Sequence, residues 1–421
     1  MDMNINRQFK RFVAAVLFLV ISAAVIHVFN NIMPAINFKA MTWLIPQTVP
    51  GSSLVGCDFI NGLYEPGRLL LSGKSPYILT QYPPLASVIG MLFSLVPNNV
   101  AYLIQVFVLL GLNIATLLFA VKLFIIAHYS KINSDDTARI VPYILFMLVL
   151  FMNLTSYCFG FSIERGNYDI YAQFFSVLGI WLLLSKPGRI WLPVIFVSLA
   201  VHCKLYPAIL FVMVVWRYGW KSIIPIFVVN AVLFLMLGPG DFLLFVDKQR
   251  GLLNSPFVWS GNHSALSFSH TVLVPLHISL PWALRATLGL PVIIWIIGTV
   301  LLFRRGFNPG QALLFFALST PLMNVIPSTS HDYKLVILYA PCLLLMGGLL
   351  LNYIESGAWR DFGLMVLLLI ALGFIARSVN LPDIFWIQNK YPFVVLIEFV
   401  AFILIVWPRG VYKMELGQPA Q

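Results

Sequence analysis

The chain has 421 residues, of which 60% are hydrophobic and only 10% are charged, and its mean hydropathy is +0.91. A soluble domain carries about 25% charged residues, so this composition excludes a soluble protein. Apolar runs recur along the whole chain, many of them near the roughly 20 residues that cross a bilayer core of about 30 Å. The alternating segments of about ten residues that build a transmembrane β-barrel are not visible. We therefore expect an all-α polytopic membrane protein.

The net charge of +11 resembles that of a nucleic-acid-binding protein, but its distribution indicates a membrane. A majority of the Lys and Arg residues lie at the N-terminus or in short loops between apolar runs, as cytoplasmic segments do under the positive-inside rule. We therefore expect the lipid bilayer, and no nucleic acid, as a partner. The four cysteines lack CxxC spacing and a paired histidine motif, so the sequence indicates neither a disulfide framework nor a zinc site.

Taken in chain order, the apolar runs predict about twelve membrane spans with both termini in the cytoplasm. The expected spans are Phe12–Ile32, Val100–Ala127, Val141–Tyr157, Ile170–Leu184, Trp191–Cys203, Tyr206–Trp216, Ile223–Leu237, Thr287–Phe303, Ala312–Asn324, Leu335–Leu351, Phe362–Ile375 and Phe393–Trp407. The apolar stretch Tyr82–Pro97 is too short to cross comfortably and has prolines at both ends, so we expect an interfacial or half-inserted helix. Residues 1–421 then form a single transmembrane domain with two large external loops, 33–98 and 238–286.

On this topology, the polar clusters of the chain lie outside the membrane or at the outer ends of spans. They are Asp58 with Tyr64, Glu65 and Arg68; residues 164–169; His202 with Lys204; residues 259–264; and residues 328–334. An ionisable residue at membrane depth is costly and by default faces a cavity or a pathway. We therefore expect any chemistry on the external face.

Each cluster also has an interpretation that needs no function. Asp58 fits a solvated loop acid or a helix N-cap, and the neighbours Glu164 and Arg165 fit an interfacial ion pair. Lys204 fits a side chain that reaches up to the membrane surface, and Asn262 fits a plain turn. These alternatives stay open at the level of the sequence.

Motifs for nucleotide binding and for common hydrolytic chemistry are missing. There is no Walker A lysine motif, no GxGxxG after a strand, no HExxH and no GxSxG elbow. A DxD metal motif is also absent near Asp58. We expect no metal and no cofactor, and a substrate that reaches an external site without a nucleotide.

Three motifs resemble the first external loop of glycosyltransferase family 87. They are Gly56-Cys57-Asp58 leading to Tyr64, then Gly73-Lys74-Ser75-Pro76-Tyr77, then Tyr82-Pro83-Pro84-Leu85. The resemblance continues, in order and spacing, over roughly residues 55–335: Gly166-Asn167, Lys204-x-Tyr206-Pro207, Gly261-Asn262-His263-Ser264, and Pro327-Ser328 before His331. Two departures stand out, because His263 occupies the place of an expected glutamine and Glu164-Arg165 replaces a more neutral approach to Gly166.

This family comprises polyprenyl-phosphate-sugar-dependent membrane transferases of the GT-C fold, including bacterial mannosyltransferases. The resemblance implies a GT-C-like bundle with external juxtamembrane helices in the inner membrane of a bacterial cell. It also implies inverting transfer of a hexosyl or pentosyl group to a lipid-linked or glycan acceptor on the extracytoplasmic face. Similar enzymes use the acid of the first external loop as a base, and this role maps onto Asp58.

The remaining polar residues are expected to bind the substrates. Those expected to bind the phosphate or the sugar of the donor are Arg165, Lys204, His331, Lys334 and Asn262. Those expected to bind the acceptor or to shape the loops are Tyr64, Glu65, Arg68, Tyr77, Tyr82, Asn167 and His263.

Other functions remain possible for such a chain. A transporter or flippase of lipid-linked saccharides would carry charges and broken helices near mid-membrane, whereas the polar residues here gather at one face. A ligase or polymerase of O-antigen type would favour a large external loop rich in Arg and His, and loop 238–286 is only moderately so. A non-catalytic scaffold would not need clusters that converge on one face.

Overall fold

The computed structural model describes residues 2–28, 56–134, 136–254, 258, 261–377 and 389–408. These residues form helices and no strand, which confirms the all-α class. One isolated antiparallel bridge pairs Asn262 with His331 within the described part of the chain. The expected loop 33–98 and the cluster 259–264 lie partly outside the described residues.

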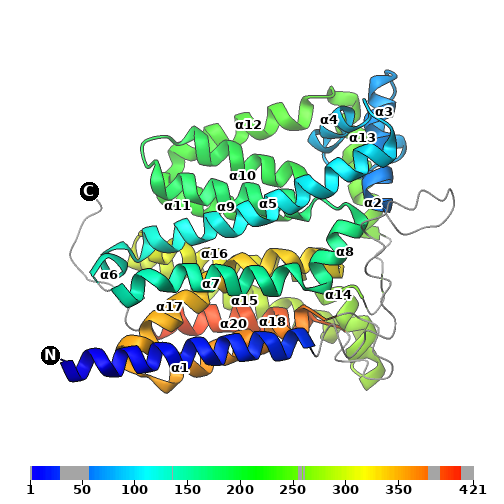
Figure 1. Ribbon diagram of the computed structural model, residues 1–421. Coiled ribbons are helices and arrows are strands. Elements are labelled where there is room, and N and C mark those ends of the chain that lie inside the picture. The colour runs from blue at the N-terminus through cyan, green and yellow to red at the C-terminus, as the bar shows by residue number, and fades with distance from the viewer. Residues whose placement is uncertain are drawn as a thin grey trace.

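Long helices build the body of the molecule, and they lie side by side in Figure 1. They are α1 (Asp2–His27), α5 (Asn98–Ala127), α7 (Asp136–Leu154), α9 (Asp169–Ser185), α10 (Trp191–Cys203), α12 (Ile223–Leu235), α15 (Leu280–Arg305), α16 (Pro309–Val325), α17 (Tyr339–Ser356), α18 (Trp359–Ile375) and α20 (Tyr391–Val406). The buried core runs through α16 and α17, all of whose residues from 311 to 325 and from 339 to 352 are buried. This core supports the other helices around it.

Shorter elements gather at one end of the bundle (Figure 1). They are α2 (Cys57–Phe59), α3 (Glu65–Leu71), α4 (Pro84–Phe93), α8 (Tyr157–Arg165), α13 (Pro239–Asn254) and α14 (Ala265–Phe268). The start of α1 and the short helix α6 (Tyr129–Ser134) lie at the opposite end. Most of the polar clusters of the sequence therefore lie at the end that holds α2 and α8.

Several helices are suited to cross a membrane. Five stretches are long and apolar enough: Arg7–His27, Asn98–Ala127, Tyr206–Leu235, Leu280–Arg305 and Asp332–Ser356. The pair Ala138–Leu154 and Tyr157–Arg165, bent by 59°, adds a sixth if it is one broken span. The stretch Tyr206–Leu235 contains the 3-10 helix η6 (Tyr206–Leu210), α11 (Phe211–Tyr218), the turn η7 (Gly219–Ser222) and α12. The chain is thus a helical membrane protein, while the count of twelve spans stays a prediction.

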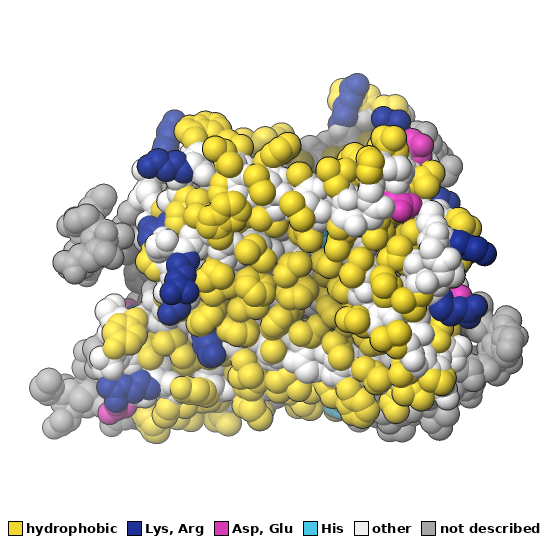
Figure 2. Space-filling model, turned by 90° about the horizontal axis from the view of Figure 1, so that it is seen from above, with side chains coloured by type: hydrophobic (Ala, Val, Ile, Leu, Met, Phe, Trp, Pro, Cys, Tyr) yellow, Lys and Arg dark blue, Asp and Glu magenta, His cyan; other side chains and the backbone are white. Residues whose placement is uncertain are grey.

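The surface supports this assignment. Figure 2 shows hydrophobic side chains across the middle of one face, with Lys and Arg gathered toward its two ends. Phe107 is 65% exposed and Phe227 is 71% exposed, and many other large apolar side chains are exposed as well. A contiguous apolar surface of this extent marks contact with lipid or protein rather than with water.

Two segments expected as loops are largely helical. Region 238–286 contains α13, α14, η8 (Ser269–Leu273) and η9 (Val274–Leu276), and α15 begins at Leu280 instead of Thr287. Its moderately polar sequence hid these helices because they are short or lack an apolar run. Helix α8 likewise occupies most of the stretch between the expected spans Val141–Tyr157 and Ile170–Leu184. The Ser156 hydroxyl accepts a 3.1 Å bond from the Phe159 N–H at its start.

The short elements are fastened to each other by close backbone contacts. A Cβ added at Gly67 of α3 would collide with the backbone of Gly90 in α4, and one added at Gly90 would collide with the Leu63 carbonyl. The two helices therefore cross with their backbones touching, which only glycine permits. This crossing holds α4, the predicted interfacial helix, against the segment that carries Asp58.

Candidate active site

The turn between α8 and α9 places the first site residues. Gly166 ends α8 with φ 67°, and a Cβ at this position would lie 2.6 Å from the Cβ of Phe59. The Gly56 N–H also donates to the Glu164 carbonyl at 2.6 Å. The Tyr102 hydroxyl of α5 donates to the same carbonyl at 3.0 Å. The end of α8 is thereby packed against α2, so that the side chain of Asp58 lies beside this turn.

Both carboxylate oxygens of Asp58 have a donor from this turn. Arg165 Nη2 lies 2.5 Å from Oδ1, and Asn167 Nδ2 lies 2.6 Å from Oδ2. The side chains of Asp58 and Arg165 are only 14% and 21% exposed, respectively. An ion pair that is shielded from water and also hydrogen-bonded is strong and fixed in direction. Asp58 is therefore a rigidly held acid, and its N-cap interpretation is not supported, because Asp58 lies within α2.

A second buried acid, Asp169 at the start of α9, lies among tyrosines and lysines. The Tyr206 hydroxyl donates to its Oδ1 at 2.7 Å, and Lys204 Nζ lies 3.6 Å from its Oδ2. Lys204 also donates to the Tyr82 hydroxyl at 3.4 Å. Burial alone would lower the pKa of Lys204, but Asp169, Tyr82 and Asp58 raise it above the ordinary lysine value. Lys204 is therefore charged at neutral pH.

Lys334 completes this side of the site. It lies in the 3-10 helix η10 (Asp332–Leu338), is 3% exposed, and places its ammonium 4.3 Å from the ring centre of Tyr206. Among the described residues, this ammonium has no hydrogen-bond acceptor and no ion-pair partner. Asp169 and Lys204 act on this amine only through the electrostatic field, from beyond contact distance. A buried amine with no acceptor in contact is available to an anion from outside the chain.

These two groups of residues form one cluster. Tyr333 is in electrostatic range of Asp58, Arg165, Tyr82 and Asp169 together. Its ring centre lies 5.6 Å from that of Phe161 in α8. The cluster therefore combines residues from α2, α8, α9, η10 and the segment that follows α10. The sequence had predicted that these polar segments lie on the same side of the membrane.

His331 lies at the edge of this cluster, in the bridge with Asn262. Its ring centre is 5.4 Å from that of Tyr333, and it interacts electrostatically with Asp58. Burial lowers the pKa of His331 to about 4, against the opposing effect of Asp332 and Asp58. The imidazole is therefore neutral at pH 7, so it can take part in donor binding as a hydrogen-bonding group.

Asn262 holds the loops together. Its Nδ2 donates to the Ser328 carbonyl at 2.8 Å, and its Oδ1 accepts from the N–H groups of Ser330 and Ser264 at 2.8 and 3.2 Å. The amide thus joins the 261–264 and 328–331 segments through hydrogen bonds within the protein. Its role here is to shape the site.

Four of the expected acceptor or loop-shaping residues have partners elsewhere. Tyr64 donates to the Val96 carbonyl at 2.9 Å. Glu65 and Arg68 form a 3.2 Å ion pair with each other at the surface. The Tyr77 ring centre lies 5.9 Å from that of Phe245 in α13. In the described structure none of the four is hydrogen-bonded to Asp58, so they contribute to the packing of the outer segments.

Sequence reasoning missed several residues that the structure brings to this end. They are Asp169, Tyr206 and Tyr333 in the cluster, and Asp332 and Lys390 behind it. Asp169 closes the polar run 164–169, and Tyr206 belongs to the Lys-x-Tyr-Pro motif, so both had a signal. Lys390 is a single lysine in the last expected external loop, and nothing local in the sequence distinguishes it.

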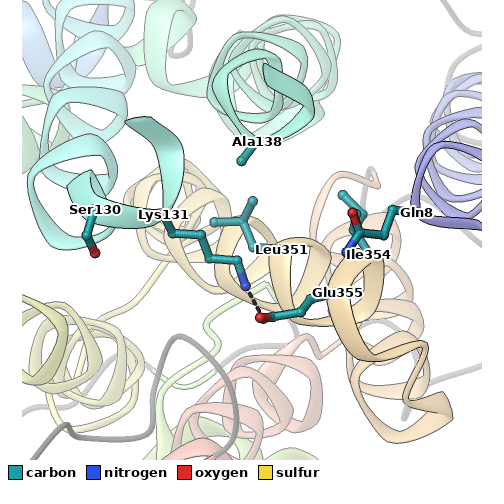
Figure 3. Close-up of a pocket in the computed structure, with 7 residues that line it drawn as sticks. All are labelled: Gln8, Ser130, Lys131, Ala138, Leu351, Ile354 and Glu355. Carbon is teal, nitrogen blue, oxygen red and sulfur yellow. Dashed lines mark hydrogen bonds and ion pairs between the residues drawn. The ribbon is translucent and has the colours of Figure 1, made fainter. Parts of the chain in front are cut away.

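Two hollows lie away from this cluster. The pocket in Figure 3, of about 370 Å³, is bordered by α1, α6, α7 and α17 at the opposite end of the bundle, where Lys131 and Glu355 form an ion pair. An apolar groove of about 400 Å³ separates α1 from α18. Neither hollow contains any residue that the motifs identified. No group of three or more His, Cys, Asp or Glu that could hold a metal is found in the described part of the chain.

The comparison with known families agrees with the motifs. The sequence model of glycosyltransferase family 87 matches residues 80–329, which is more than half of the chain. The matched range includes Arg165, Lys204 and Asn262; it begins after Asp58 and ends just before His331. No curated protein matches the chain.

The turn at Gly166 gives a test of how the site is held. An alanine there would adopt a left-handed conformation that costs about 1–2 kcal/mol, in addition to its collision with Phe59. We expect Gly166→Ala to lower the free energy of unfolding by about 2 kcal/mol or more, measured by denaturation of the purified protein. Gly188→Ala is the matched control, because a Cβ there meets nothing within 4 Å. Equal stability of both variants would contradict the packing described for the turn.

Proposed function

Since the chain belongs to glycosyltransferase family 87, we propose that it transfers a sugar from a polyprenyl-phosphate donor to a lipid-linked or glycan acceptor, with Asp58 as the general base. The family supports glycosyl transfer as the activity. The donor, the inversion of the anomeric centre and the role of Asp58 are the proposal, argued below from the geometry of the cluster.

The single observation that carries this proposal is the distribution of charge around Asp58. Arg165 is paired with Asp58, and Lys204 with Asp169, while Lys334 has no carboxylate partner in the described structure. A phosphate group would supply the missing negative charge. Charge-assisted bonds to phosphate are about twice as strong as neutral ones, and they strengthen as charge develops on a leaving group. A lipid phosphate as the leaving group therefore fits this cluster.

In the proposed reaction, the oxygen of an acceptor hydroxyl attacks the anomeric carbon of the donor sugar. The bond between that carbon and the phosphate oxygen breaks, and the electron pair leaves with the polyprenyl phosphate. Asp58 takes the hydroxyl proton. The ion pair with Arg165 holds the carboxylate in one orientation while it takes the proton. Attack opposite to the leaving group inverts the anomeric carbon.

The neutral imidazole of His331 suits a hydroxyl better than a phosphate. A hydrogen bond to the Gly261 backbone raises the pKa of His331, as a bond from a ring N–H to a carbonyl oxygen does. The ring also lies in electrostatic range of Asp58, where the reacting hydroxyl would be held. We assign His331 to sugar or acceptor binding, with Lys334, Lys204 and Arg165 toward the phosphate.

For the topology we propose about twelve spans, with both termini cytoplasmic and the site on the extracytoplasmic face of a bacterial inner membrane. The basic residues of the short loops support this orientation under the positive-inside rule. A twelve-span bundle with short helices at one end is the GT-C-like arrangement that the resemblance implies. The absence of polar clusters near mid-membrane in the sequence favours this reading over a flippase.

The role of Asp58 is tested by Asp58→Asn. The amide keeps the size of the side chain and can still accept from Arg165, but it cannot take a proton. We expect sugar transfer from a polyprenyl-phosphate sugar to fall by about 10²-fold or more in the purified protein. Asp136→Asn, which changes a side chain that is 92% exposed near the opposite end, is the control. Undiminished transfer by Asp58→Asn would exclude Asp58 as the base.

Lys334 is tested by Lys334→Met, which keeps the length of the side chain and removes its charge. Hydrogen bonds to charged groups contribute about 1.5–3 kcal/mol, so we expect the apparent KM for the donor to rise about tenfold or more. A titration of the donor at saturating acceptor measures this change, with the exposed Lys74→Met as the control. An unchanged donor KM together with a raised acceptor KM would move Lys334 to the acceptor side.

The orientation is tested by labelling single cysteines in intact cells, in a background where Cys57 is replaced by serine. Lys74 and Gly188 are both exposed and lie at opposite ends of the bundle under the proposed topology. We expect a membrane-impermeant thiol reagent to label Lys74→Cys from outside and to label Gly188→Cys only after the membrane is opened. The reverse pattern would overturn the proposed orientation.

A further inference from the structure

A group of three buried polar residues lies behind the site, and the proposed reaction does not use it. The three are His263, Asp332 and Lys390, which are 0%, 1% and 2% exposed, respectively. The Lys390 ammonium donates to Asp332 Oδ1 and to the Arg377 carbonyl. His263 Nε2 lies 3.1 Å from the same Asp332 oxygen. We refer to these three residues as the rear network.

The geometry assigns the tautomer of His263. The backbone N–H of Lys390 donates to His263 Nδ1 at 3.1 Å, so Nδ1 accepts and carries no proton. The ring proton is therefore on Nε2, which faces Asp332. The carboxylate of Asp332 is shared by a neutral imidazole and one ammonium, so the charges of the network balance without any group from outside.

The rear network joins segments that are distant in the sequence. The backbone N–H of His263 donates to the Ser330 carbonyl at 2.6 Å. The side-chain Nδ2 of Asn389 donates to the Asn262 carbonyl at 3.0 Å. Asp332 itself begins η10. The residues on both sides of His331 are thus fixed, and Lys334 follows two residues later on the same short helix.

The burial of the three side chains argues against direct contact between the rear network and a substrate. In the described structure none of them is hydrogen-bonded to Asp58, Arg165 or Lys204. A substrate would have to break a buried ion pair to reach them, which would leave a buried charge without its partner. Their effect on the reaction must pass through the residues that they hold.

We propose that His263, Asp332 and Lys390 are positioning residues that hold His331 near Asp58 and Lys334 near Asp169, and so set the affinity for the phosphate-linked donor. This inference rests on the proposed function. It also explains why a histidine occupies position 263: one ring nitrogen accepts a hydrogen bond, and the other presents an N–H to a carboxylate.

The physics of buried ion pairs suggests the variants. Removing one member of such a pair leaves an unpaired buried charge and destabilises the protein, whereas replacing both by apolar residues of similar size is often neutral. The double variant Asp332→Leu/Lys390→Met therefore removes the network while keeping the fold. His263→Gln keeps an acceptor and an N–H donor, and His263→Leu removes both. Asp136→Asn/Arg139→Met, an exposed pair at the opposite end, is the matched control.

The test measures the unfolding temperature, kcat, the donor KM and the direct binding of polyprenyl phosphate for each purified variant. For the double variant we expect an unfolding temperature near that of the wild type, a donor KM raised about tenfold, weakened polyprenyl-phosphate binding and little change in acceptor KM. His263→Leu is expected to raise the donor KM as well, while His263→Gln and the exposed control behave like the wild type.

Three results would count against the proposal. A stable double variant with the wild-type donor KM would overturn the positioning role and leave the proposed function intact. A His263→Gln variant as impaired as His263→Leu would overturn the assigned hydrogen bonding. A wild-type protein that neither transfers sugar from polyprenyl-phosphate donors nor binds polyprenyl phosphate would overturn the proposed function and this inference together.

Discussion

Charge that is buried at one end of an apolar bundle must be paired, and this constraint organises the site. Three pairs satisfy it: Asp58 with Arg165, Asp169 with Lys204, and Asp332 with Lys390. A buried charge without a partner costs several kcal/mol, so each acid fixes the place of a base from another segment. The partners in the first and third pairs are 107 and 58 residues apart in the chain. Each pair therefore ties together two segments at this end of the bundle.

Lys334 departs from this rule, since in the described structure its amine contacts the ring of Tyr206 and has Asp169 only in electrostatic range. A protein can carry such a side chain where a ligand supplies the opposite charge. The two lysines of the cluster differ in how they are held. Lys204 is fixed in place by its ion pair with Asp169, whereas Lys334 has no carboxylate in contact in the described structure.

The sequence predicted the helices and their order well, because apolar runs and basic loops are local signals. Each of the twelve expected spans contains a helix, and Tyr82–Pro97 contains the short helix α4. The predicted grouping of Asp58, Arg165, Asn167, Lys204 and Lys334 at one end also has structural support. The exposed pair of Glu65 and Arg68 shows the limit of this reasoning, since a polar cluster near an acid can simply pair with itself.

What the sequence could not predict depends on long-range pairing. Lys390 follows a polar segment like many others, and only the fold brings it to Asp332 and His263. The helices of region 238–286 were not predicted, because their apolar residues do not form a run of spanning length. The neutral state of His331 follows from burial, which a one-dimensional pattern does not contain.

The crossing of α3 and α4 at Gly67 and Gly90 has a mechanical consequence. Because the two backbones touch, neither helix can rotate or slide against the other without first separating. The two crossed helices therefore form a rigid support for the adjoining segment that carries Asp58. A substrate that needs more room must gain it by movement of the elements that face α3 and α4, so the helices that support Asp58 need not move when the site opens.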